Sequence, residues 1–161
     1  MTERIPDPVA EALAAAGWQP GRRAEDRARE WALRIGGYAT PDGRQHTVLP
    51  AAIEAYAEFG GLRVPPAGPG EEVAASAVDL DPLRALHSVA TLAGLADALG
   101  VPLSPLGVEN DGAGILAVDR TGRVFLLDHA GDWYLGETVP EALAVLLLGR
   151  QPARIAEDGV W

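Results

Sequence analysis

The side chains that most often carry chemistry are few and scattered in this sequence. The three histidines, His46, His87 and His129, stand far apart, and none has a second histidine at the i, i+4 spacing of a helical metal site. We therefore expect them to be surface or hydrogen-bonded residues. None of the three serines lies in a G-x-S-x-G nucleophile motif, and the chain has no cysteine and no lysine. These absences predict a protein without catalytic residues, metal or cofactor.

Two pairs of carboxylates are the remaining candidates for chemistry. Asp79 and Asp81 stand two residues apart before an expected helix, and Asp128 and Asp132 flank a short turn. Such pairs could bind a cation or perform acid–base work. Each also has a structural explanation, because Asp81 precedes a proline at an expected helix start and the second pair lacks the later glutamate of a calcium loop. The structural explanations are favoured.

The formal net charge is −10, and it is unevenly distributed. Residues 70–119 hold eight acidic side chains against one arginine, Arg84. A nucleic-acid binder needs cations to neutralise phosphates, and an anionic membrane would repel this chain, so both partners are excluded. Opposite fields favour a cationic protein partner. A purely solubilising acidic face is an equally open alternative.

Length and composition indicate one globular domain. A chain of 161 residues with 48% hydrophobic residues can bury a core without disulfides or metal. The absence of cysteine fits a reducing cytoplasm. The first residues, Met1-Thr2-Glu3-Arg4, have no apolar segment, so we expect no signal peptide, and no apolar run is long enough to span a bilayer.

Helical periodicity and helix-ending glycines predict helices in both halves of the chain. Five are expected, at residues 8–16, 24–35, 50–59, 82–99 and 139–148. A T-x-x-E capping box, Thr138 to Glu141, opens the last one.

Alternating apolar residues predict strands mainly in the C-terminal third. We expect them at residues 62–64, 72–79, 103–108, 114–119, 123–128 and 133–135, with the third at a sheet edge because of Pro102 and Pro105. The Gly112-Ala113-Gly114 segment precedes a strand, so we interpret it as a turn. The order predicts an α+β domain over residues 1–150, with N-terminal helices, a central helix and an antiparallel meander closed by a C-terminal helix. Residues 151–161 are expected to form a loosely packed tail.

Five segments, in this order, resemble the third family of the SUKH superfamily. They are Ala16-Gly17-Trp18-Gln19-Pro20-Gly21-Arg22, Glu58-Phe59-Gly60-Gly61-Leu62, residues 99–107, residues 119–124 and residues 135–143. Each segment is weak alone, but the ordered set covers about residues 11–150. Within it, Gly17, Trp18, Pro20, Gly21, Arg22, Gly60 and Gly61 have a structural explanation in helix ends, core packing and ion pairing.

The resemblance implies an immunity protein that binds and neutralises a toxin of a bacterial polymorphic toxin system inside the producing cell. The toxin would be a nuclease or a nucleic-acid deaminase with a basic cleft. Two alternatives stay open, a non-catalytic adaptor of the same fold and an enzyme that uses the carboxylate pairs. The partner-binding residues we expect are Asp79, Asp81, Asp128, Asp132, Trp133 and Glu137, with Trp133 as an aromatic anchor. The resemblance fixes neither the toxin nor the oligomeric state.

Overall fold

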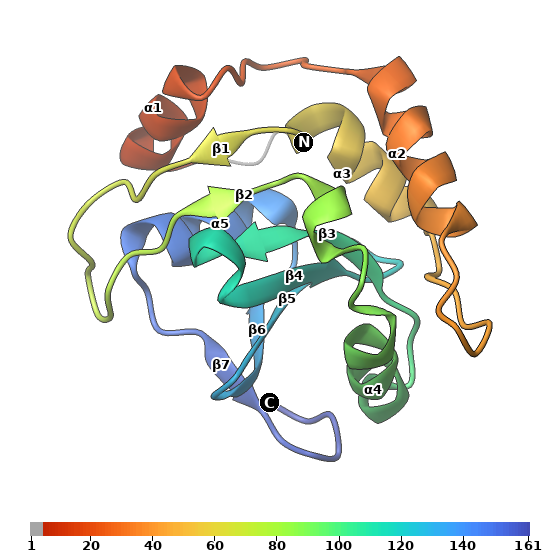
Figure 1. Ribbon diagram of the computed structural model, residues 1–161. Helices are drawn as coiled ribbons and strands as arrows, with labels where there is room; N and C mark the ends of the chain where they lie inside the picture. Colours follow the sequence, from red (N-terminus) through yellow and green to blue (C-terminus); the bar gives the residue numbers. More distant parts are fainter. Residues whose placement is uncertain (1–4) are drawn as a thin grey trace.

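Five α-helices and seven β-strands make up the computed structural model, which describes residues 5–161 (Figure 1). The α-helices are α1 (Asp7–Ala15), α2 (Glu25–Gly37), α3 (Pro50–Phe59), α4 (Val89–Leu99) and α5 (Val139–Leu148). The strands are β1 (Arg63–Val64), β2 (Val78–Asp79), β3 (Ser104–Glu109), β4 (Gly114–Val118), β5 (Val124–Asp128), β6 (Gly131–Gly136) and β7 (Ala153–Ile155). Two short 3₁₀ helices, η1 (Pro82–Ala85) and η2 (Asn110–Gly112), complete the elements. Met1 to Arg4, which gave the expectation of no signal peptide, lie outside the described residues.

The strands form one sheet in sequence order, β1 to β7, and every neighbouring pair is antiparallel. The predicted α+β fold with an antiparallel meander is therefore confirmed. No helix within residues 5–161 is long and apolar enough to cross a membrane.

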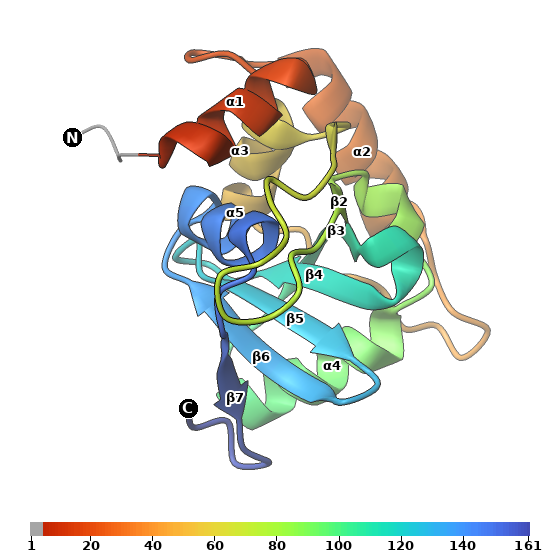
Figure 2. The same ribbon diagram turned by 90° about the vertical axis from the view of Figure 1, so that its left-hand side faces the viewer.

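Helices cover both faces of the sheet (Figure 2). Along β4, Leu116 and Val118 join the larger apolar cluster, which includes residues of α1, α2, α3 and α5. Ala117, between them, joins a smaller cluster with Leu92 and Leu95 of α4. This alternation, with both sides buried, explains why the central strands are apolar at nearly every position.

The predicted strand over residues 72–79 is mostly wrong. Only Val78 and Asp79 pair with other strands, because the preceding backbone bonds to the end of α5 instead. The Ser76 N–H donates to the carbonyl oxygen of Leu146, and the N–H groups of residues 72 and 73 donate to that of Gly149. Carbonyls in the last turn of a helix have no partner inside the helix, so this segment satisfies them.

The helix predicted over residues 82–99 divides into η1 and α4. Asp81 caps η1 by accepting a hydrogen bond from the Leu83 N–H at 3.0 Å, as its structural explanation predicted. After η1, the carbonyl oxygen of Leu86 accepts a hydrogen bond from Nε2 of His46 at 2.7 Å, and α4 begins at Val89.

Two expectations about the sheet's edges change. β3 lies between β2 and β4, although β2 opposes only Val108 and Glu109. The proline-containing half of β3 therefore has no strand on that side among residues 5–161, and its ladder with β4 shifts register between Pro105 and Gly107. At the other end of the chain, α5 packs on the sheet as expected, but the residues after it form a further strand. β7 pairs with β6, and the Trp161 ring stacks on Tyr134 with centroids 4.7 Å apart.

Candidate partner-binding site

The signature segment (residues 16–22) is built around the end of α3. The Arg22 guanidinium donates hydrogen bonds of 2.8 and 3.0 Å to the carbonyl oxygens of Glu58 and Gly60. The Trp18 ring stacks on Phe59 with centroids 6.2 Å apart. Two of the five resembling segments thus meet in space, in a structural role.

The glycines of these two segments fit tight or left-handed positions. Gly17, Gly21 and Gly61 have positive φ, whereas Gly60 does not. At Gly60 a Cβ would lie 2.4 Å from the ring of Trp31, which is 4% exposed. Trp18 is only partly buried, and its Nε1 has no hydrogen-bond partner among the described residues.

A hollow of about 800 Å³ opens beside Trp18. Its wall is mostly apolar, from α1, α3, the β4–β5 turn and the start of α5, and Pro20 and Gly21 also line it. The signature residues therefore border a surface hollow as well as holding the end of α3.

The first predicted carboxylate pair lies in a network of arginines. Asp79 Oδ2 is 3.2 Å from Nη1 of Arg84 and 3.4 Å from Nε of Arg63. Arg84 also forms an ion pair with Asp111, with Nη2 and Oδ1 3.0 Å apart. Asp111 is one of two non-glycine residues with a positive φ among the described residues. Arg84 is the one arginine between residues 70 and 119, but Arg63 joins it across the β1–β2 ladder. This part of the acidic segment is thus charge-matched.

The second pair lies at the turn between β5 and β6. Asp128 Oδ1 accepts hydrogen bonds from the N–H groups of Ala130 and Gly131, at 2.9 and 3.1 Å, and from Nε1 of Trp133 at 3.2 Å. The turn interpretation therefore holds, and Asp128 also orients the indole. The Arg154 guanidinium lies 5.0 Å from the centre of the Trp133 ring, so a strand that the sequence did not predict supplies a cation to the predicted aromatic anchor.

The predicted partner-binding residues do not form one face. Asp79 and Asp132 lie in one row across the sheet, but four strand spacings separate them, roughly 19 Å. Asp128 and Trp133 point to the opposite face of the sheet, toward α5. Glu137 follows the far end of β6 and accepts a hydrogen bond from the Tyr134 hydroxyl at 2.6 Å. We call Asp79, Asp81, Asp128 and Asp132 the acidic rim, and Glu137 lies outside it.

Asp119, in the resembling β4–β5 segment, is buried and structural. Burial opposes its ionisation, but hydrogen bonds from Arg123 and Thr121 outweigh burial and lower its pKa. Its Oδ2 accepts from Nε of Arg123 at 2.7 Å. One more acidic charge of the sequence is thus neutralised locally.

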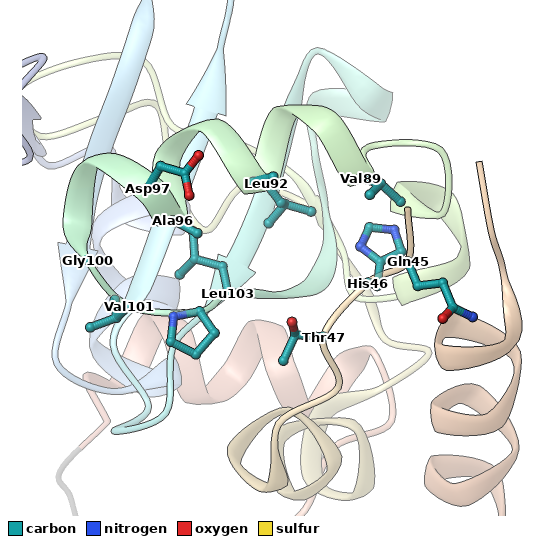
Figure 3. Close-up of a pocket in the computed structure, with 12 residues that line it drawn as sticks. Gln45, His46, Thr47, Val89, Leu92, Ala96, Asp97, Gly100, Val101 and Leu103 are labelled. Atoms are coloured by element: carbon teal, nitrogen blue, oxygen red, sulfur yellow. The ribbon is translucent and has the colours of Figure 1, made fainter. Parts of the chain in front are cut away.

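Another hollow, of about 430 Å³, lies between α4 and residues 45–47 and 101–103 (Figure 3). Its titratable lining residues, His46 and Asp97, lie at opposite ends (Figure 3). Burial lowers the pKa of His46. The hollow therefore holds no acid–base pair.

Two of the scattered histidines come together around Tyr38. The ring centroids of His87 and His46 lie 5.1 and 6.4 Å from that of Tyr38, a cluster that no local sequence pattern signals. Within residues 5–161 no three histidine or acidic side chains are arranged to hold a metal ion.

The protein is thus an α+β domain. Its signature residue Arg22 binds backbone carbonyls, and its candidate residue Asp79 binds arginines. Comparison with known families agrees with the resemblance, because the model of the SUKH-3 immunity protein family matches residues 5–149. The chain therefore belongs to the SUKH-3 immunity protein family. No curated protein and no solved structure matches the chain.

Proposed function

We propose that this protein binds a secreted toxin that acts on nucleic acid, a nuclease or a deaminase, and neutralises it inside the producing cell by covering its active site. Membership of the SUKH-3 immunity protein family is the observation that carries the proposal. A toxin that holds a polyanion needs a basic cleft, and a chain with net charge −10 complements such a cleft. The protein acts by binding and not by catalysis.

The proposed contact surface is the end of the sheet that carries Asp128, Asp132 and Trp133. Trp133 is partly buried and oriented by Asp128, so little side-chain entropy is lost when a partner contacts it. Asp79, with its ion-pair partners Arg63 and Arg84, and Asp81 form a second contact region, roughly 19 Å from Asp132 across the sheet. There the ion pairs of Asp79 can exchange partners. Glu137 is outside it.

The test is co-expression with the toxin domain encoded beside this gene, with cell survival and co-purification as readouts. Association kinetics of the purified pair at two salt concentrations then test the surface. Acidic steering predicts that the association rate falls steeply with salt, and that Asp-to-Asn changes at all four rim positions mainly slow association.

A matched control also removes four acidic charges, at the exposed α1 and α2 residues Asp7, Glu11, Asp26 and Glu30. The control should leave the association rate close to that of the wild type. Equal effects of the two variants would mean that net charge, and not the rim, steers the partner. Survival and co-purification both absent for the wild type would contradict the proposed function.

A further inference from the structure

A third hollow, of about 350 Å³, lies between residues 73–76, the turn after β5 and the end of α5. We call it the Glu109 pocket. Apolar walls come from Leu126, Val145 and Leu146, and Trp133 also lines it. Two carboxylates, Glu109 and Asp128, face the same space.

Glu109 is a buried carboxylate without an ion pair. It is 8% exposed, and its Oε2 accepts a hydrogen bond from the Ser76 hydroxyl at 2.7 Å. Its other oxygen, Oε1, receives no hydrogen bond from any residue within 5–161. An ionised carboxylate in an apolar surrounding is costly unless a cation compensates it. The pocket therefore lacks one positive charge to pair with Glu109.

The sheet brings the second carboxylate to the same place. Gly114 of β4 pairs with Glu109 on one side and with Asp128 on the other, so both side chains point to one face. A Cβ at Gly114 would lie 2.8 Å from Oε1 of Glu109, which places that oxygen over the glycine, on the side toward Asp128. Asp128 uses Oδ1 for its three hydrogen bonds, and no described residue donates to its Oδ2.

The two arginines near the pocket already have partners in this chain, and His129 also lines the pocket. Arg150 lines the pocket, but its Nε lies 3.3 Å from Oε1 of Glu71. Arg154 lies over the Trp133 ring. Among the described residues, neither Glu109 nor Asp128 forms an ion pair.

We propose that the Glu109 pocket receives one cationic side chain, an arginine or a lysine, from the protein that this chain binds. The charge fits the carboxylates, the aliphatic stem of either side chain fits the apolar walls, and the volume accommodates one such group. The proposal rests on the proposed function and names the specific contact by which a basic toxin surface would be held. Burial of that contact makes it a determinant of the dissociation rate.

The test compares Glu109→Gln with Asp97→Asn in complex with the toxin domain encoded beside this gene. Glutamine keeps the size and the acceptor for Ser76 but removes the charge, whereas Asp97 is exposed on α4, away from the pocket. Glu109→Gln should raise Kd by about 30-fold or more, mainly through faster dissociation, as loss of one partner of a buried pair does. Asp97→Asn should change Kd by less than about 3-fold, as exposed charges do.

A double-mutant cycle identifies the occupant. Alanine replacements of the toxin's arginines and lysines should include one whose effect disappears in the Glu109→Gln background. The pocket assignment would be overturned, with the immunity function intact, if Glu109→Gln bound as tightly as the wild type. It would also be overturned if every toxin substitution were additive with Glu109→Gln. Absence of a wild-type complex would overturn both. Since Glu109→Gln removes a buried charge, its melting temperature should not fall, which separates lost contact from lost fold.

Discussion

Nη2 of Arg22 donates a 3.0 Å hydrogen bond to the carbonyl oxygen of Gly60, 38 residues further along the chain. Its other terminal nitrogen binds the carbonyl oxygen of Glu58, so one planar guanidinium satisfies two acceptors where α3 ends. This contact joins the two most distinctive segments that resemble the SUKH-3 family. The contact gives both segments a structural role, through hydrogen bonds to backbone carbonyls where an ion pair was expected of Arg22.

Replacing Arg22 should therefore lower stability. Arg22→Ala removes both hydrogen bonds and should reduce the free energy of unfolding by about 1–3 kcal/mol. Arg22→Lys should recover only part of the loss, because a single ammonium does not reproduce the fork. Urea unfolding measures both changes. The control is Arg29→Ala, whose ion pair with Asp26 is exposed and should contribute less than about 1 kcal/mol. Equal effects at the two arginines would contradict the scaffold role.

Replacement by alanine should lower stability at Gly60 and raise it at Gly94. At Gly60 a Cβ would meet the Trp31 ring and the carbonyl oxygen of Tyr56, both at 2.4 Å, so Gly60→Ala should cost roughly 1–3 kcal/mol through overpacking. Gly94 lies inside α4 with open space around the Cβ position, and Gly94→Ala should stabilise by about 0.5–1 kcal/mol. Thermal melting of the two variants tests the pair. A loss of stability in Gly94→Ala would mean that α4 tolerates no side chain there.

Sequence patterns predicted those elements whose signals are local. α5 begins at a capping box in which Thr138 accepts a hydrogen bond from the Glu141 N–H at 3.2 Å, and it ends at the left-handed Gly149. Both signals lie within the helix's own residues. The β4–β5 hairpin is similar, because Asp119 accepts hydrogen bonds from the N–H groups of Thr121 and Arg123 within its own turn.

Elements whose partners are remote in sequence were missed. The Ser76 N–H bonds to Leu146, 70 residues away, and nothing near residues 72–77 signals that helix end. β7 forms a strand because it pairs with the free edge of β6. Its own three residues do not indicate this pairing. The prediction of the candidate site was incomplete for the same reason. The excess of acidic residues is visible in the sequence, but the ion pair of Asp79 with Arg63 depends on strand register. The only local indication of Glu109 is a charged residue at the end of an apolar strand.

Glu109 should make stability depend on pH. Burial raises its pKa, with the hydrogen bond from Ser76 opposing and the charge of Asp128 adding to the rise. The folded protein therefore keeps this proton to higher pH than the unfolded chain does. Its stabilising contribution is complete below the unfolded pKa and is lost as pH rises through the folded pKa.

The measurement is the free energy of unfolding from about pH 4 to about pH 8, which brackets the ordinary range of a glutamate and its upward shift. Glu109→Gln should lack this decline and should be at least as stable as the wild type at neutral pH. Superimposable pH profiles would show that Glu109 ionises in the folded state without cost. The Glu109 pocket would then already compensate its charge.

Trp161 should stabilise the C-terminal end of the sheet. Its ring is 4.7 Å from Tyr134 at an angle of 15°, and it meets Phe125 edge-on at 5.9 Å. Trp161→Ala should lower the free energy of unfolding by about 0.5–1.5 kcal/mol, the range of an aromatic pair. Val160→Ala is the matched control, because Val160 is 61% exposed and should contribute little. Amide hydrogen exchange locates the effect, since loss of the stack should speed exchange in β7 and leave β4 unchanged. Unchanged exchange in β7 would mean that pairing with β6 alone holds the last strand in place.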